Sequence, residues 1–320
     1  MKILAIESSC DETAVAVVED GKKVLSNAIY TQIEIHKLYG GVVPEIASRH
    51  HIAKITYVID QALTEANVTM KDIDYIAVTG YPGLVGSLMV GINAAKTLAM
   101  CYDLPIVFVD HIVGHIYANY LTDDFNFPVI ALVVSGGHTE LVLMEDHLKF
   151  KVLGETLDDA VGEAYDKIAR VVDVGYPGGP IIDNMAKEGK PVYSLPHIKL
   201  AKDSYDFSFS GLKSAVINLA NKAKEKNEEL NKNDLAASFQ DAVVDVLVSK
   251  TKRATEEFNT KQVIVAGGVA ANKGLRKGLN DAFSNTDVKV TFPEFKYCTD
   301  NAAMIGAAAY FMIKNDKQGN

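Results

Sequence analysis

Cysteine is scarce in this chain of 320 residues, which contains only Cys10, Cys101 and Cys298. Their number is odd and no two of them have C-x-x-C spacing, so the sequence indicates neither a disulfide framework nor a cysteine-based metal site. Free thiols in a reducing cytoplasm are expected.

Long apolar runs are also absent. Only four apolar residues separate Lys2 from Glu7, too few for the apolar segment of a secretory signal. The longest uncharged run, Ala77–Ala95, has about the length of a membrane span, but it is interrupted by Gly80, Pro82, Gly83, Gly86, Gly91 and Asn93. A buried strand, a glycine-rich turn and the start of a helix are expected there, in a cytoplasmic protein with no membrane association.

Basic residues are fewer than acidic ones. The chain has 32 Lys and Arg and 41 Asp and Glu, which gives a net charge of −9. Such a chain does not coat nucleic acid by electrostatics alone. The segments Lys273–Leu279 and Arg49–Lys54 are candidate local basic patches, with a solvated helix face as the alternative for each. A hydrophobic fraction of 48% is typical of a soluble globular protein, and the length predicts two compact units.

An internal repeat organises the chain. Without gaps, "ILAIESSCDETAVAVVED" (Ile3–Asp20) aligns with "VIALVVSGGHTELVLMED" (Val129–Asp146). The matching pairs are Ala5 and Ala131, Ser9 and Ser135, Thr13 and Thr139, Glu19 and Glu145, and Asp20 and Asp146. Each copy has an apolar run, a small or polar turn and an alternating apolar run, the pattern of a β-hairpin. The repeat predicts a duplicated fold.

A second pair of segments supports the duplication. "IDYIAVTGYPGLVGSLMVGINAAKTLA" and "KQVIVAGGVAANKGLRKGL" each run from an apolar strand through a glycine-rich turn into a helical pattern. This is the order of a βα turn that faces a phosphate or a nucleotide. A single turn of this kind is weak evidence, since tight turns need glycine anyway. Four turns in a repeated order favour an α/β nucleotide-binding fold.

Apolar residues spaced by three and four predict the helices. The predicted ranges are Glu45–Glu65, Gly86–Ala99, His111–Tyr120, Leu157–Val171, Gly211–Glu225, Leu235–Phe258 and Asn301–Ile313. The charged stretch Asn221–Asp234 is expected to be a helix end and a connector.

The stretch "VDHIVGHIYANY" places His111 and His115 four residues apart on one of these helices, as in the zinc-protease motif H-E-x-x-H. Ile112 follows the first His, so the Glu that activates water in such proteases is missing. Residues with this spacing have Cβ atoms about 6 Å apart and can share a metal ion. Two histidines alone leave a site incomplete, and an ordinary histidine pair on a helix surface is the alternative.

Seven motifs, in this order, resemble the TsaD family of bacterial tRNA N6-adenosine threonylcarbamoyltransferases, formerly labelled O-sialoglycoprotein endopeptidases. They are "IESSCDETAVAV", "DHIVGHIYAN", "SGGHTEL", "GEAYDKIAR", "YPGGP", "FSFSGLK" and "AGGVAAN". The resemblance covers nearly the whole chain. It implies the α/β fold of the actin, Hsp70 and sugar-kinase superfamily (RNase H-like), with a nucleotide cleft between two duplicated lobes. The implied lobes are residues 1–125, completed by a C-terminal helix at 301–320, and residues 126–300.

The resemblance also implies a ligand set for the metal. It adds Asp300 to His111 and His115, although a residue just before a helix is otherwise a simple N-terminal cap. Two His and one carboxylate leave coordination positions open and suit Fe²⁺, with Zn²⁺ as the alternative.

Nucleotide contacts are implied at a second set of positions. The glycine-containing turn would receive a phosphate or carboxylate of an adenine nucleotide, either threonylcarbamoyl-AMP or ATP, and the turn residues are Val134, Ser135, Gly136, Gly137 and His138. Asp166, Gly179, Asp183 and Asn272 would contact the adenylate. Without the resemblance, His138 is a turn histidine, the two Asp are helix-surface charges and Asn272 is a helix cap.

The implied reaction transfers threonylcarbamoyl from the adenylate to N6 of adenosine 37 in tRNAs that read codons beginning with A. Asp11 or Glu12 in the first turn is the candidate base, with Asp11 preferred and a solvated turn as the alternative. The implied partners are tRNA, a paralogous TsaB subunit, the TsaE ATPase and the TsaC synthase, which supplies the donor. The segment Glu34–Leu63 is the expected docking surface.

Two alternatives stay open at this stage. A sugar or acetate kinase of the same superfamily would use the same turns but would need no histidine pair. An inactive nucleotide-binding scaffold subunit would also lack tight metal binding.

Overall fold

A computed structural model of the chain describes residues 1–196 and 203–318. Contacts divide the chain into two compact units. Unit 1 consists of Met1–Asp124 and the segment that starts at Pro293. Unit 2 consists of Phe125–Phe292. The last two residues of the predicted C-terminal helix at 301–320 lie outside the described residues.

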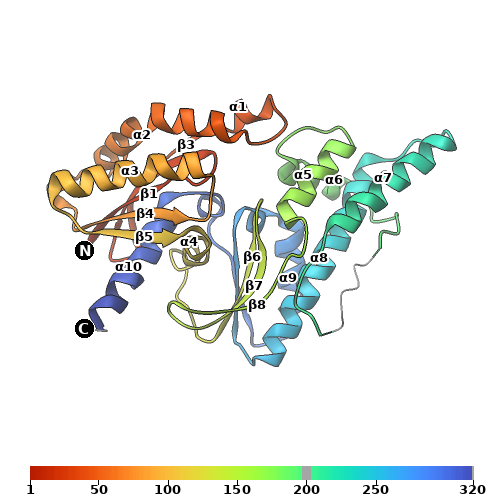
Figure 1. Cartoon of the computed structure of the whole chain (residues 1–320). Coiled ribbons are helices and arrows are strands. Elements are labelled where there is room, and N and C mark those ends of the chain that lie inside the picture. Colours follow the sequence, from red (N-terminus) through yellow and green to blue (C-terminus); the bar gives the residue numbers. More distant parts are fainter. Residues whose placement is uncertain (197–202, 319–320) are drawn as a thin grey trace. The chain divides into compact units, whose positions relative to one another are not determined.

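Unit 1 is a five-stranded sheet with helices on both faces (Figure 1). Its elements are β1 (Lys2–Glu7), β2 (Glu12–Glu19), β3 (Lys23–Thr31), α1 (Ile33–Lys37), α2 (Pro44–Ala66), η1 (Met70–Asp72), β4 (Tyr75–Tyr81), α3 (Val85–Tyr102), β5 (Ile106–Asp110), α4 (His111–Ala118), η3 (Phe295–Tyr297) and α10 (Ala302–Gln318).

The strand β1 shows why this sheet forms a middle layer. Leu4 and Ile6 belong to the apolar core that includes residues of α2 and α3. On the other face Ala5 lies against α10, where a Cβ added to Gly306 would meet it at 3.4 Å. A strand that is buried on both faces is expected to be continuously apolar, as the run "ILAI" is.

Unit 2 repeats the sheet. Its elements are β6 (Val129–Val134), β7 (Thr139–Asp146), β8 (Lys149–Glu155), α5 (Val161–Val171), α6 (Gly178–Glu188), α7 (Ser210–Glu225), α8 (Lys232–Glu257), β9 (Gln262–Ala266), η2 (Gly268–Ala271), α9 (Lys273–Phe283) and β10 (Lys289–Thr291). Within this unit α8 packs against β6 and β9, and α9 packs against β10.

The predicted duplication is confirmed at the level of strand register. The sheet orders are β3-β2-β1-β4-β5 and β8-β7-β6-β9-β10, so each strand of unit 1 has a counterpart. Ala5 pairs with Ala16 in the first hairpin, and their repeat partners Ala131 and Val142 pair in the second. In both units the first strand then pairs in parallel with the strand of the glycine-rich βα segment.

The predicted helices all exist, but one begins later than predicted, and α1 and α6 were not predicted. The helix predicted from Leu157 begins at Val161, because the preceding residues form a loop in which Thr156 Oγ1 donates to the Asp159 carbonyl at 2.7 Å. The helix α6 was not predicted, since its first residues, Gly-Gly-Pro, have the composition of a turn. None of the helices in the described part of the chain is long and apolar enough to cross a bilayer.

Candidate metal centre and nucleotide turn

The histidine pair lies where β5 passes directly into α4. Asp110, the last residue of β5, caps the helix, because its Oδ1 accepts hydrogen bonds from Ile112 N at 2.7 Å and Val113 N at 3.1 Å. The helix therefore begins at His111, and His115 follows one turn later on the same face. The two buried rings lie edge to face with their centroids 4.6 Å apart.

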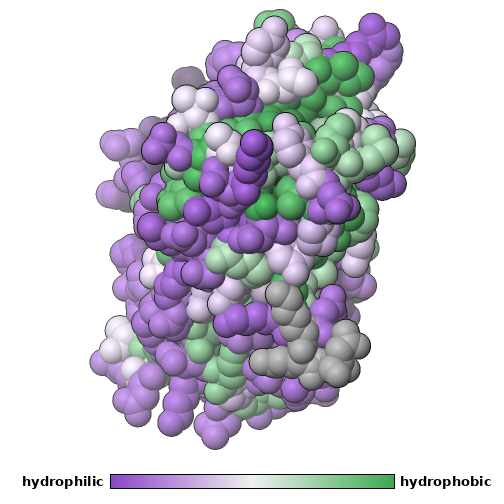
Figure 2. Space-filling view, turned by 90° about the vertical axis from the view of Figure 1, so that its left-hand side faces the viewer, coloured by the Kyte–Doolittle hydropathy of each residue, from purple (hydrophilic) through white to green (hydrophobic). Residues whose placement is uncertain are grey.

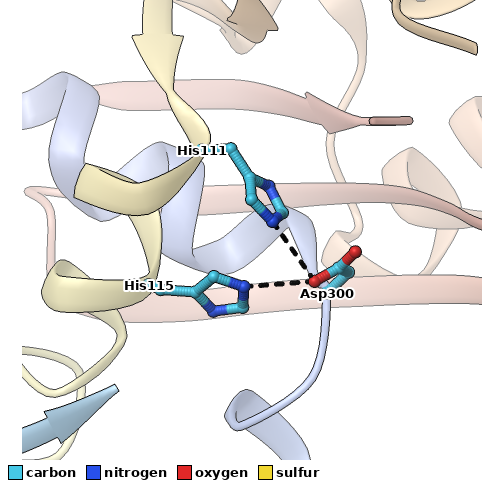
Figure 3. A group of neighbouring side chains, drawn as sticks. All are labelled: His111, His115 and Asp300. Atoms are coloured by element: carbon cyan, nitrogen blue, oxygen red, sulfur yellow. Dashed lines mark ion pairs between the residues drawn. The ribbon is translucent and has the colours of Figure 1, made fainter. Parts of the chain in front are cut away.

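Asp300 reaches these rings from the loop between η3 and α10. The cap of α10 is the neighbouring Asn301, whose Oδ1 accepts from Met304 N at 3.1 Å and whose Nδ2 donates to the Thr299 carbonyl at 2.8 Å. The Asp300 side chain is therefore not the cap and points toward the histidines (Figure 3). A Cβ added to Gly114 would lie 2.7 Å from Ile305 Cδ1, so a glycine between the two histidines lets α4 approach α10 closely.

The three side chains have the spacing of metal ligands. Asp300 Oδ1 lies 3.1 Å from His115 Nε2 and 3.5 Å from His111 Nε2, and all three candidate ligand atoms lie within 4.8 Å of one another. Two ligands bound about 2.1 Å from one tetrahedral ion lie roughly 3.4 Å apart. The donor set of two imidazole nitrogens and one carboxylate oxygen therefore fits a single divalent cation.

Glu7 completes this group, and the sequence analysis did not identify it. It ends β1 and its side chain is fully buried, with Oε2 2.9 Å from His111 Nδ1. The available signal was the internal repeat, in which Val133 occupies the position equivalent to Glu7. A carboxylate at a strand position that is apolar in the other copy indicates a function other than core packing.

The charged groups of this site shift one another's pKa values. Burial alone would lower the pKa of His111, but the carboxylates of Asp300 and Glu7 raise it to about 9. Burial would raise the pKa of Asp300, yet His111 and His115 lower it to about 2. Burial would raise the pKa of Glu7, but the charge of His111 and its hydrogen bond lower it below the usual value. The group therefore holds two carboxylates and a positively charged ring at neutral pH in the absence of a metal.

The first hairpin turn adds a carboxyl pair to unit 1. Burial, followed by the charge of Asp11 and then that of Asp300, raises the pKa of Glu12 well above its usual value. Asp11 and Glu12 share a hydrogen bond, and Thr31 Oγ1 donates to Glu12 Oε1 at 3.1 Å. His51 anchors the turn, with Nε2 donating to the Cys10 carbonyl at 2.9 Å. The raised pKa favours the protonated form of Glu12.

The equivalent turn of unit 2 is closed at its ends by hydrogen bonds and has open space beside its two glycines. Ser135 N donates to the His138 carbonyl at 2.8 Å, and His138 N donates to Ser135 Oγ at 3.0 Å. Gly136 and Gly137 are exposed, and a Cβ at either would meet nothing within 4 Å. Val134 ends β6 as a fully buried residue. The turn thus offers open backbone, as an anion-binding turn requires.

The first residues of α5 contact this turn, and α5 in turn binds the first residues of α6. Gly162 N, at the start of α5, donates to the Ser135 carbonyl at 3.1 Å, and a Cβ on Gly162 would lie 2.6 Å from that oxygen. Asp166 of α5 accepts from Gly178 N at 2.7 Å, and it also accepts from the backbone of Gly179. Burial raises the pKa of Asp166 despite these bonds. Asp166 therefore caps α6 in addition to any role toward a ligand.

Asp183 and Asn272 lie together in the same unit. Asp183 Oδ1 accepts from Gly274 N at 3.2 Å at the start of α9. Asn272 caps α9, with Oδ1 accepting from Leu275 N at 2.8 Å, and its Nδ2 donates to Gln240 Oε1 at 2.9 Å and Tyr165 Oη at 3.3 Å. The Asn272 side chain is thus fully hydrogen-bonded within the chain. A nucleotide would contact it only by replacing one of these bonds.

A family model described as "TsaD: tRNA N6-adenosine threonylcarbamoyltransferase" matches residues 23–307. The chain belongs to this TsaD family. A tRNA N6-adenosine threonylcarbamoyltransferase of Staphylococcus saprophyticus is 59% identical over 312 residues, which cover 98% of this chain and 91% of the relative. One of Bacillus cereus is 58% identical over 317 residues, which cover 99% and 92%.

Solved structures support the fold. HypF of T. kodakarensis superposes with a TM-score of 0.65 at 14% identity, covering 98% of this chain and 48% of HypF. The predicted class, two duplicated α/β lobes of the actin, Hsp70 and sugar-kinase type, is confirmed. The TsaD resemblance that the seven motifs indicated is confirmed as well.

Proposed function

We propose that this chain transfers the threonylcarbamoyl group from threonylcarbamoyl-AMP to N6 of adenosine 37 in tRNAs that read codons beginning with A. The N6 amine attacks the carbamoyl carbonyl carbon and forms the new C–N bond. The bond from that carbon to the phosphate oxygen breaks, AMP leaves with the electron pair, and the amine loses a proton. The relatives named for this transfer share 58–59% of their residues with the chain.

The observation that carries the proposal is the group of His111, His115 and Asp300, with ligand atoms within 4.8 Å of one another. A sugar or acetate kinase has no use for such a group, and neither does a scaffold subunit. A cation bound there supplies a Lewis acid and a template for oxygen atoms of the donor. Fe²⁺ is the proposed ion and Zn²⁺ the alternative, because two His and one carboxylate leave open coordination positions.

The proposed proton acceptor is Asp11. In the hydrogen-bonded carboxyl pair, the raised pKa of Glu12 favours its protonated form. The Asp11 carboxylate is then left to accept the proton that the attacking amine loses. Glu12 shares a hydrogen bond with Asp11, and Thr31 Oγ1 in turn donates to Glu12.

The proposed nucleotide site is the turn Val134–His138, with its two exposed glycines, and the helix starts beside it in unit 2. Backbone N–H groups of such a turn and the positive ends of helices stabilise a phosphate. Asp166, Gly179, Asp183 and Asn272 are the proposed contacts to the adenosine of threonylcarbamoyl-AMP or ATP.

The proposed partners are tRNA, a TsaB-like paralogue, the TsaE ATPase and the TsaC synthase, in the cytoplasm. For the paralogue, the proposed docking surface is Glu34–Leu63, extended by α3. A groove of about 660 Å³ lies between α2 and α3 and includes the exposed Ile52 and the half-exposed Met89. Figure 2 shows apolar surface in the upper part of the view, and α2 and α3 lie in the upper part of Figure 1. Ile52→Glu is expected to weaken association with TsaB without changing the metal content.

The direct test is a reconstitution. Purified chain, threonylcarbamoyl-AMP, partner subunits and unmodified tRNA are expected to release AMP and to add the mass of one threonylcarbamoyl group to adenosine 37. His115→Ala, which removes one candidate ligand, is the matched negative control, and Lys252→Ala on the exposed side of α8 is the positive one. ATP-dependent phosphorylation of a sugar or carboxylic acid, or modification by the His115→Ala variant at the wild-type rate, would overturn the proposal.

Peptide cleavage gives a second test, because Ile112 stands where a zinc protease needs its Glu. No peptidase activity on sialoglycoproteins is expected from protein freed of contaminants. Cleavage that survives repurification and disappears in His111→Ala would contradict the assignment of these histidines.

A further inference from the structure

The carboxylate of Glu7 has a counterpart in unit 2 that shows what the fold alone requires. The repeat aligns Glu7 with Val133, and the strand registers align its neighbour Thr79 with Ala266. Val133 and Ala266 pair directly and are both fully buried. Equivalent positions in the two sheets are thus apolar in unit 2 and polar in unit 1. Folding of this sheet therefore does not need a buried carboxylate.

Three groups in the described part of the chain lie within hydrogen-bonding distance of the Glu7 carboxylate. Ser9 N donates to Oε1 at 2.5 Å, Thr79 Oγ1 donates to Oε2 at 2.6 Å, and His111 Nδ1 lies 2.9 Å from Oε2. The side chain is 0% exposed, so no bulk water replaces these bonds. An ionised carboxylate only accepts hydrogen bonds. The Nδ1 atom of His111 must therefore carry the proton in this arrangement.

We infer that Glu7 is a positioning residue that fixes the tautomer of His111 when a cation is bound, with the proton on Nδ1 and the lone pair of Nε2 left for the cation beside Asp300. This inference rests on the proposed metal site. Neutral imidazole binds a cation through its unprotonated nitrogen, and a hydrogen bond from the other nitrogen orients the ring. His115 differs, because its buried Nδ1 has no hydrogen-bond partner in the part of the chain that is described. Of the two histidine ligands, His111 is the one that is held in place.

The substitution Glu7→Gln tests the tautomer directly. Ser9 N–H needs an acceptor, so the amide oxygen of Gln takes the place of Oε1 and its NH₂ group faces His111. That NH₂ group is a donor, and Nδ1, whose other neighbour is Ser9 Oγ at 3.2 Å, loses the carboxylate that holds its proton. The tautomer with the ring proton on Nε2 is then favoured. The measured quantity is Zn²⁺ affinity by competition with a chelator. A loss of about 10–100-fold is expected, the range that such supporting residues produce.

Two further variants separate positioning from folding. Thr79→Val removes one donor to Glu7 but keeps the Glu7–His111 bond, and its Zn²⁺ affinity is expected to stay within about threefold of wild type, below the range for supporting residues. The double variant Glu7→Val with Thr79→Ala copies the apolar pair of unit 2. It is expected to keep the circular dichroism of the wild type and to lose Zn²⁺ affinity as Glu7→Gln does.

A spectroscopic readout is independent of activity. With Zn²⁺ bound and histidine labelled with ¹⁵N, the wild type and Thr79→Val are expected to show a slowly exchanging proton on His111 Nδ1. Glu7→Gln is expected to lack it. If the wild type binds Zn²⁺ and Glu7→Gln binds it equally with the Nδ1 proton retained, this inference is wrong and the metal site stands. If the wild type binds neither Zn²⁺ nor Fe²⁺, both the metal site and the inference are wrong.

Discussion

The turns of the two duplicated hairpins have the same strand register but opposite chemistry. In unit 1 the turn carries Cys-Asp-Glu, and in unit 2 the equivalent positions are Gly-Gly-His. The first turn holds a hydrogen-bonded carboxyl pair in which burial and the neighbouring charges raise the pKa of Glu12. The second presents two glycines with open space beside them. A duplicated backbone has thus been given one acidic turn with a carboxyl pair and one neutral turn whose open backbone suits an anion.

The residues that the repeats share have also acquired different partners. Ser9 Oγ lies 3.2 Å from Nδ1 of His111, whereas Ser135 Oγ accepts from His138 N within its own turn. Thr139 Oγ1 accepts from Val161 N at the start of α5, whereas its repeat partner in β2 binds a buried histidine of α2. Identity between repeats therefore preserves the local fold and does not predict the chemistry.

The largest expected effect comes from Asp300→Ala. This variant removes a candidate ligand from unit 1 and leaves the residues of the unit 2 turn unchanged. Transfer and stoichiometric metal binding are expected to fall by more than about 100-fold, since even residues that only support a ligand change affinity by about 10–100-fold. Elemental analysis and the transfer assay measure this loss. Affinity for AMP, measured by calorimetry, is expected to stay unchanged, and a parallel loss of AMP binding would show that the two turns do not have separate roles.

The acidic turn and its metal centre also predict a pH dependence. The pKa of His111 is raised to about 9, so the ring binds a proton more tightly than an unfolded His with its usual value near 6.5. A cation must displace that proton, and its apparent affinity is expected to rise about tenfold per pH unit between pH 7 and 9 and then to level off.

The stability of the fold has the opposite pH dependence and falls as the pH rises. Without a metal, the raised pKa of His111 stabilises the fold fully below about pH 6.5, and this contribution is lost as the pH rises through about 9. Zn²⁺ titrations and urea unfolding at matched pH values measure the two trends. An affinity that is flat above pH 7 would contradict the coupling of His111 to Asp300 and Glu7.

A smaller effect is expected when the chemistry of one turn is placed in the other. Gly137→Asp gives the unit 2 turn the residue that Asp11 provides in unit 1, and the exposed position accommodates it without a clash. Repulsion between this carboxylate and a phosphate at an exposed turn is about 1–2 kcal/mol, a five- to thirtyfold loss of AMP affinity. Gly137→Ala is the matched control and is expected to bind AMP as the wild type does. Equal losses in both variants would point to backbone strain in place of charge.

Much of the fold was predictable because it repeats. The hairpins, their parallel strands and most helices follow from apolar patterns that occur twice, and the structure confirms them. The helix α6 was missed because Gly-Gly-Pro is typical of turns, and its start is stabilised by Asp166, a residue of another helix. A cap supplied from outside the local segment leaves no local pattern to detect.

The site was predictable only where its residues are close in sequence or shared with a family. The spacing of His111 and His115 indicated a cation, and the TsaD resemblance brought in Asp300. Glu7 is 104 residues from its partner His111, so no local spacing connects them. The comparison with Val133 in the other repeat was the one signal in the sequence for a carboxylate with a function.

The smallest expected effect compares two helix caps, one for each unit. Asn301 caps α10 beside Asp300, and Asn272 caps α9 in unit 2. Both are buried, and replacing either by Ala is expected to lower the free energy of unfolding by about 1–2 kcal/mol, the range for a lost cap. Their effects on ligands should diverge. Asn301→Ala loosens the loop that holds Asp300 and should weaken Zn²⁺ binding a fewfold with AMP binding unchanged.

Asn272→Ala should do the reverse, since it frees Gln240 and Tyr165 in unit 2 and leaves the histidines untouched. Urea unfolding, Zn²⁺ competition and AMP calorimetry on the two variants give a two-by-two comparison in which stability falls in both and each ligand is affected in one. If Asn301→Ala weakened AMP as much as Zn²⁺, the caps would be acting through general loss of stability. The division of chemistry between the acidic and the neutral turn would then have no support from the residues that frame them.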